Sequence, residues 1–155
     1  RDIKPENIVL LKDGSLKLLD FGVARVVGAL PDGVALPERA RTRTGAIIGS
    51  AHYMAPEQAL GRVREIDGRT DIYGLGATLH HALSGQPLHQ GLSDASLLIA
   101  AATREVPSLA TVAPGLPTLL VSVVDRCLRK ERADRYPDVV TLRADLLALR
   151  KASAR

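Results

Sequence analysis

Two short apolar runs separated by an Asp-Gly pair place the strongest constraint on how the first part of this chain can fold. The runs cover residues 8–11 and 15–19, and the tripeptide Lys-Asp-Gly lies between them. An Asp-Gly pair between such runs is a strong signal for a tight hairpin turn. The sequence therefore predicts a small two-stranded ribbon, with Asn7 at one end and Asp20 at the other.

The rest of the chain has the periodicity of loops and then helices. Residues 23–50 contain glycine and proline breakers and no sustained period, which predicts a long surface loop. From Ile72 to Leu83 apolar residues recur at helical spacing, and Gly85 follows at the position favoured for a helix stop. A second helix is predicted from Ser93 or Asp94 to about Arg104. A third begins at Pro117 and has Leu120, Val124 and Cys127 on one face. A last amphipathic helix has Val139, Leu142, Leu146 and Leu149 on one face. A proline-rich connector is expected at residues 106–117.

Length and composition favour one globular domain. The 155 residues are 46% hydrophobic and 25% charged, which is ordinary for a folded domain and excludes disorder over the whole length. The predicted fold class is α+β and mainly α-helical, with the small hairpin as its β part. The domain is expected to cover residues 1–151 and to be followed by a tail at residues 152–155.

Charge and cysteine content exclude other classes of protein. The net charge of +4 is scattered along the chain, and with three tyrosines, one phenylalanine and no tryptophan there is no basic stripe with interleaved aromatic residues, so no nucleic-acid partner is expected. The single cysteine, Cys127, allows no intrachain disulfide and favours a reducing compartment. No apolar run approaches the roughly 18 residues that span a bilayer, so no membrane segment is expected in this chain.

The residues on either side of the predicted hairpin suit phosphoryl transfer. The string RDIKPEN supplies Asp2, Lys4 and Asn7, and the string LLDFGVA supplies Asp20. That reaction needs a carboxylate beside the attacking hydroxyl, a cation on the migrating phosphate, and oxygen ligands for magnesium. These four residues supply all three.

With a third string, GSAHYMAPEQ at residues 49–58, the chain resembles the protein kinases, and within them the bacterial serine/threonine kinases of the eukaryotic-like type. Arg1 matches the second residue of the His-Arg-Asp triplet of that family, so the chain resembles a carboxy-terminal lobe that begins inside the catalytic loop. The amino-terminal lobe, with its glycine-rich loop and its lysine, is expected to be a missing partner. The 155-residue fragment alone is therefore expected to be inactive.

The resemblance implies a role for each motif residue of the cleft. Asp2 would orient the substrate hydroxyl or accept its proton, and Lys4 would contact the transferring phosphate and indicate serine/threonine specificity. Asn7 and Asp20 would bind Mg²⁺, or Mn²⁺ in its place, together with ATP. Val9 would lie beneath the adenine ring, although a strand residue that faces the core fits the sequence equally well.

The resemblance also implies a phosphorylation switch in the long loop. Arg1 and Arg25 would form a phosphate pocket, because two guanidinium groups that face a loop favour a dianion between them. Thr42 and Thr44 lie where similar bacterial kinases are phosphorylated, and two solvated loop threonines are the alternative. Ser50 occupies the hydroxyl position between the catalytic aspartate and lysine, where many members of the family have threonine.

Four further residues would be structural. Phe21 would pack behind the site and control the direction of Asp20. Glu57 would form a buried ion pair with Arg135, and Asp71 would anchor the backbone of the catalytic loop, a role compatible with a charge at a helix start.

We therefore expect part of an enzyme that transfers the γ-phosphoryl group of ATP to serine and threonine hydroxyls of proteins, in the cytoplasm. A membrane segment elsewhere in the parent protein is compatible with this expectation. The alternative is a non-catalytic scaffold of the pseudokinase type, or a truncated gene product that merely folds.

Overall fold

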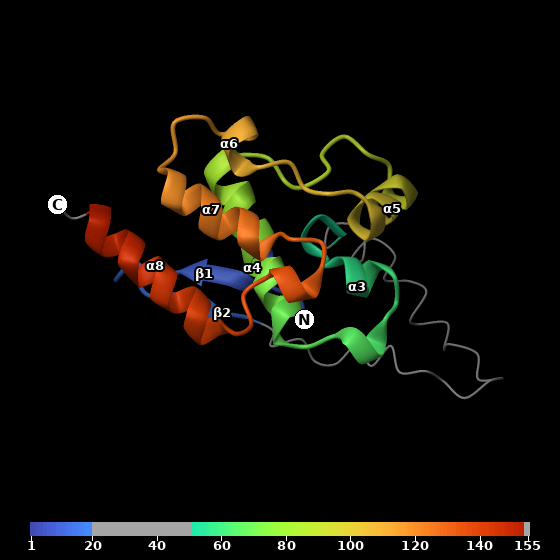
Figure 1. Cartoon of the computed structure of the whole chain (residues 1–155), viewed down its shortest axis with the longest axis horizontal. Helices are drawn as coiled ribbons and strands as arrows, with labels where there is room; N and C mark the ends of the chain where they lie inside the picture. The colour runs from blue at the N-terminus through green and yellow to red at the C-terminus, as the bar shows by residue number, and fades with distance from the viewer. Residues whose placement is uncertain (20–50, 154–155) are drawn as a thin grey trace.

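The computed structural model describes residues 1–19 and 51–153 of the chain (Figure 1). A two-stranded hairpin lies beside a body of helices. The strands are β1 (Ile8–Leu10) and β2 (Leu16–Leu18), and the α-helices are α3 (Pro56–Ala59), α4 (Gly68–Ser84), α5 (Asp94–Thr103), α6 (Leu109–Val112), α7 (Thr118–Cys127) and α8 (Val139–Ser153). Short 3-10 helices are η1 (Pro5–Asn7), η2 (Ala51–Tyr53), η3 (Val63–Glu65) and η4 (Arg132–Asp134).

The predicted hairpin is confirmed. The strands β1 and β2 are antiparallel, with Ile8 opposite Leu18. The turn is closed by a hydrogen bond from the Leu11 amide to the Ser15 carbonyl at 2.8 Å. Gly14 has φ = +81°, a conformation that glycine adopts without the steric cost that a Cβ would impose.

Helix α4 is the central helix of the body, and its predicted end is confirmed. The chain leaves the helix at Gly85 in the left-handed conformation, with φ = +73°. Its start lies earlier than expected, because the Asp67 carboxylate accepts a hydrogen bond from the Arg69 amide at 2.8 Å and so caps the helix in front of Gly68. Asp71 therefore lies in the first turn and does not open the helix.

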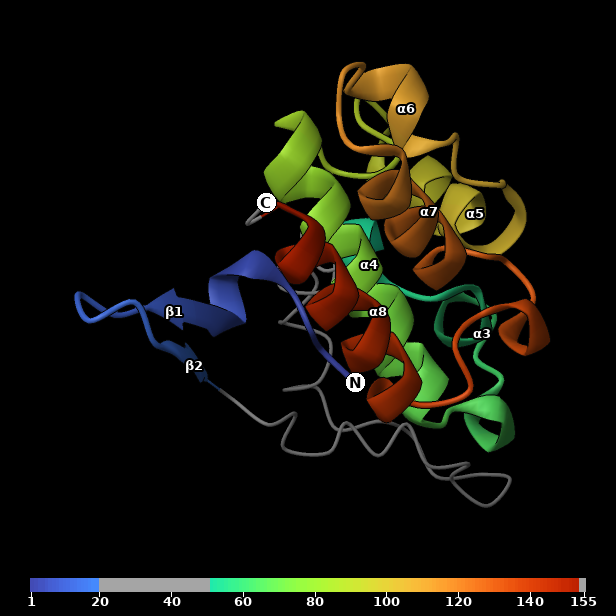
Figure 2. The same ribbon diagram turned by 60° about the vertical axis from the view of Figure 1, so that its left-hand side comes forward.

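Two apolar clusters surround α4. One cluster joins α4 to α6 and α7 through residues such as Tyr73, Leu109 and Val124. The other joins α4 to α7 and α8 through Ile72, Cys127 and Leu142. Figure 2 shows α7 and α8 beside α4, with the hairpin projecting from the helical body. Residues 1–3 pack against the helical body, where they contact α3 and α4.

The helical predictions in the second half hold, with differences at the ends. The connector contains the short helix α6, which the sequence did not predict because a four-residue helix is too short to show a period. In α8 the predicted apolar face is buried at Leu142, but Val139 is 59% exposed. The helix continues to Ser153, past the predicted end of the domain at residue 151.

Candidate active site

At the short helix η1, two of the motif residues, Lys4 and Asn7, contact the carboxylate of a third, Asp2. Asp2 Oδ2 lies 3.0 Å from Lys4 Nζ and accepts a hydrogen bond from Asn7 Nδ2 at 3.2 Å. Asn7 Nδ2 also donates to the Asp2 carbonyl at 2.8 Å. Pro5 begins η1 with the φ that a helical turn needs, and the Asn7 amide closes the turn onto the Lys4 carbonyl at 3.0 Å. The carboxylate is therefore held in one orientation by a cation and an amide.

The exposure of these groups suits a reaction at the surface of the helical body. The side chain of Asp2 is 43% exposed, whereas that of Lys4 is only 16% exposed. A carboxylate that is oriented and accessible can accept a hydrogen bond from an incoming hydroxyl, which is the geometry required of a general base. A shielded ammonium beside it acts as a cation of fixed position.

Helix α4 contacts this loop through Asp71 and Gly74. The Asp71 carboxylate accepts a hydrogen bond from the amino-terminal ammonium group of Arg1, with which it also forms an ion pair. Gly74 lies against Ile3, because a Cβ on Gly74 would be 3.1 Å from the Ile3 carbonyl oxygen and 3.2 Å from its Cβ. The sequence analysis missed Gly74, and the one signal was a glycine inside a helical pattern, which needs a packing reason to offset its cost.

Helix α3 supplies a second contact that the sequence analysis missed. Gln58 Nε2 donates a hydrogen bond to the Arg1 carbonyl at 2.8 Å. The residue is the third of a helix that begins with a proline, which predicts a role at the helix start but not a contact with a distant loop.

The hairpin carries Val9, one of the residues predicted to face the nucleotide, and leads toward Asp20. The Leu19 amide donates to the Asn7 carbonyl at 2.8 Å, so the ribbon returns the chain to Asn7 one residue before Asp20. Val9 is the middle residue of β1, opposite Lys17, and is partly buried. Asp20 itself lies outside the described residues, as do these other predicted residues: Phe21, Arg25, Thr42, Thr44 and Ser50.

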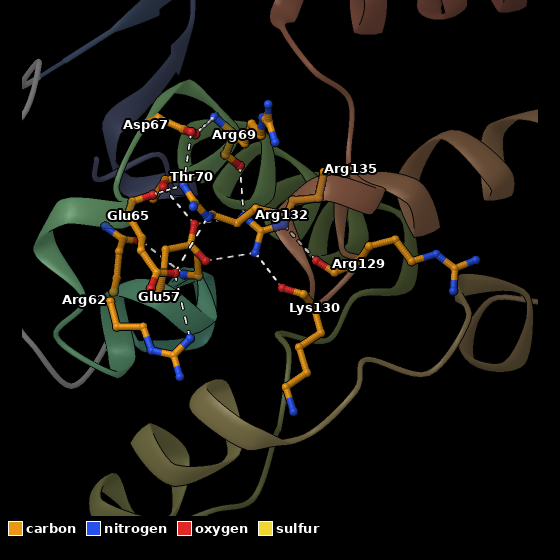
Figure 3. A network of polar contacts seen from close by, with 12 residues as sticks. Glu57, Arg62, Glu65, Asp67, Arg69, Thr70, Arg129, Lys130, Arg132 and Arg135 are labelled. Carbon is orange, nitrogen blue, oxygen red and sulfur yellow. Dashed lines mark hydrogen bonds and ion pairs between the residues drawn. The ribbon is translucent and has the colours of Figure 1, made fainter.

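Glu57 and Arg135 form the predicted buried ion pair (Figure 3). Arg135 Nη1 and Nη2 donate to Glu57 Oε1 and Oε2, each at 2.9 Å. Thr70 Oγ1 donates to the same carboxylate at 2.7 Å. Burial by itself would raise the pKa of Glu57, but the hydrogen bonds from Arg135, from its own backbone and from Thr70 hold that pKa below its ordinary value.

The remaining donors of Arg135 are also used. Its guanidinium donates to three backbone carbonyls, those of Arg69, Arg129 and Lys130. The guanidinium carbon lies 4.9 Å from the centre of the Tyr73 ring. This arginine therefore ties the start of α4 to the segment between α7 and η4.

The donor chemistry near Asp2 fits a hard divalent cation in part. Because Asn7 Nδ2 is engaged by Asp2, the orientation of the carboxamide is fixed, and its oxygen is a ligand type that Mg²⁺ accepts. Within residues 1–19 and 51–153 there is no cluster of three or more histidine, cysteine, aspartate or glutamate residues that could hold a metal ion.

The same part of the chain has no helix with the length and apolarity needed to cross a bilayer.

Comparison with known proteins matches residues 1–143 to the family described as the protein kinase domain. The chain is 36% identical over 149 residues to the serine/threonine-protein kinase PknL of Mycobacterium tuberculosis, a match that covers 96% of this chain and 35% of that protein. It is 35% identical over 155 residues to the serine/threonine-protein kinase PknB of Mycolicibacterium smegmatis, where the match covers 99% of this chain and 23% of that protein. The chain thus spans about a third or less of the length of these relatives.

Proposed function

This chain belongs to the protein kinase family, and on that premise we propose that it forms the catalytic-loop half of an enzyme that transfers the γ-phosphoryl group of ATP to serine or threonine hydroxyls of proteins. The single observation that supports this most is the convergence of Lys4 and Asn7 on one oxygen of the Asp2 carboxylate. A phosphoryl transfer site is mainly a matter of positioning and charge stabilisation, and these three side chains provide both.

In this proposal Asp2 orients the substrate hydroxyl and accepts its proton as the new bond forms. Lys4 lies 3.0 Å from the same carboxylate, so its ammonium is next to the point at which charge develops on the transferring phosphate. Val9, on the hairpin beside the loop, would contact the adenine ring.

Asn7 and Asp20 would hold Mg²⁺, or Mn²⁺ in its place, through one amide oxygen and one carboxylate. A divalent cation at this position neutralises charge on the phosphates of ATP when bound. The contribution of Asn7 is twofold, because the same carboxamide also orients Asp2 through its nitrogen.

We further propose that phosphate on Thr42 or Thr44 switches the site on, with Arg1 and Arg25 as its pocket and Ser50 between Asp2 and Lys4 on the substrate side. Of the two arginines proposed for this pocket, Arg1 lies among the described residues, and its side chain is 55% exposed. Mass spectrometry of the active protein should find phosphate on one of these threonines. Because ATP is the phosphate donor, we place the reaction in the cytoplasm.

Transfer of radiolabelled phosphate from ATP to a general protein acceptor such as casein tests the function directly. The intact protein should label the acceptor in the presence of Mg²⁺, and acid hydrolysis should release phosphoserine and phosphothreonine. Phosphotyrosine as the main product would contradict the proposed specificity. Nucleotide binding without any transfer would contradict the proposed activity and favour a scaffold.

A further inference from the structure

Gln58 connects the start of α3 to the residue that precedes Asp2. Its Oε1 accepts a hydrogen bond from the Ala55 amide at 3.0 Å, and its Nε2 donates to the Arg1 carbonyl at 2.8 Å. The first bond caps the helix, and the second reaches a segment 57 residues away in the chain. The Gln58 carboxamide therefore accepts a hydrogen bond at the start of its own helix and donates one to the catalytic loop.

The bond to Arg1 acts on the peptide group that leads into Asp2. A carbonyl held by a donor fixes the plane of its peptide group, and that plane sets the direction in which the next residue leaves the backbone. The nitrogen of Arg1, which is the amino-terminal ammonium group of this chain, pairs with Asp71 of α4. Arg1 is thus contacted by side chains from two different helices, with Gln58 acting on the carbonyl that leads into Asp2.

We propose that Gln58 is a positioning residue that sets the orientation of Asp2 through the Arg1 carbonyl. This inference rests on the proposed function, because the group that it positions is the proposed base. A shift of about 1 Å in such a group can cost roughly 100-fold in rate, so a single hydrogen bond to the adjoining peptide is enough to matter.

The two hydrogen bonds of Gln58 can be separated by mutation. In Gln58→Glu the introduced carboxylate still accepts from the Ala55 amide, and a negative charge in the first turn of a helix is favourable, so α3 should persist. The same carboxylate cannot donate to the Arg1 carbonyl and repels it. Gln58→Ala removes both bonds. Gln90→Glu, at an exposed position in the connector after α4, makes the same charge change and serves as the control.

The test measures kcat, the KM for ATP and the thermal midpoint of the intact protein and its variants. Gln58→Glu should lose about tenfold in kcat, equivalent to one hydrogen bond of about 1.4 kcal/mol, with the KM for ATP and the midpoint close to wild type. The loss should shrink as the pH is lowered, because the protonated carboxylic acid can donate to the Arg1 carbonyl again. Gln90→Glu should match the wild type at every pH.

Amide hydrogen exchange of residues 1–7 gives a readout that does not depend on activity. It should be faster in Gln58→Glu than in wild type or in Gln90→Glu. If the wild type transfers phosphate and Gln58→Glu has an unchanged kcat and unchanged exchange, the positioning role is wrong while the proposed function stands. If the wild type transfers no phosphate, the proposed function fails, and unchanged exchange would then overturn the positioning as well.

Discussion

Arg135 and Glu57 meet through two parallel hydrogen bonds of 2.9 Å, although 78 residues separate them in the chain. Their side chains are almost fully buried, at 0% and 3% exposure. The pair connects the segment after α7 to α3, the helix whose Gln58 also contacts the Arg1 carbonyl. Disruption of the pair should therefore affect both stability and the site.

Removal of one partner from this pair should be costly. Glu57→Gln leaves a buried guanidinium without its counter-ion, and Arg135→Met leaves a buried carboxylate, so each should lower the free energy of unfolding by about 3–5 kcal/mol. Urea unfolding measures this, with Arg143→Met at an exposed position of α8 as the control. Single variants with the urea midpoint of the wild type would show that the pair does not contribute.

The contact between Gly74 and Ile3 predicts an effect on turnover. Gly74→Ala places a methyl group 3.1 Å from the Ile3 carbonyl oxygen, so the loop must shift next to Asp2. We expect kcat to fall by about tenfold or more, even though alanine has the higher helix propensity. Gly68→Ala is the control, because an added Cβ there meets nothing within 4 Å. Equal kcat values for both variants would mean that the loop tolerates the shift.

The two atoms of the Asn7 carboxamide should have separable effects. Asn7→Ala removes the proposed metal ligand and should raise the Mg²⁺ concentration needed for half-maximal activity several-fold. Asn7→Asp keeps an oxygen ligand but removes the donor to Asp2, so it should lower kcat with a smaller change in Mg²⁺ dependence. A titration of activity with Mg²⁺ checks both, and an unchanged midpoint in Asn7→Ala would argue against metal binding there.

The buried His80 and the partly buried His89 predict a loss of stability in acid. Desolvation lowers the pKa of His80 and of His89 below the ordinary 6.5, and Arg104, His52 and His80 lower that of His89 further. At His80, a hydrogen bond with the Gln86 backbone and the charge of Asp125 oppose this lowering of the pKa, and His81 adds to it. The unfolded chain therefore binds protons that the folded chain does not, and the free energy of unfolding decreases as the pH falls below 6.5 towards the folded-state pKa values.

Urea unfolding at about pH 7.5 and about pH 5.5 measures this dependence. His89 has φ = +57°, which asparagine tolerates, so His89→Asn removes a titrating group without backbone strain. The variant should lose less stability between the two pH values than the wild type. An identical loss would show that His89 does not contribute.

The sequence predicted elements whose signals are local. The Asp-Gly turn gave the hairpin, and helical periodicity with a terminal glycine gave the end of α4. Gln58 and Gly74 were missed because their importance arises only when α3 and α4 pack against residues 1–3. The pairing of Glu57 with Arg135 came from the resemblance to protein kinases, since no local pattern links residues so far apart.

The most direct test of the proposed site is the turnover of Asp2→Asn in the intact protein. The amide has nearly the same shape as the carboxylate but cannot accept a proton, so kcat should fall by about 10²–10⁴-fold while the KM for ATP stays near the wild-type value. Asp134→Asn, at an exposed position in η4, should leave kcat unchanged. An Asp2→Asn variant with wild-type turnover would contradict the assignment of this residue as the catalytic base.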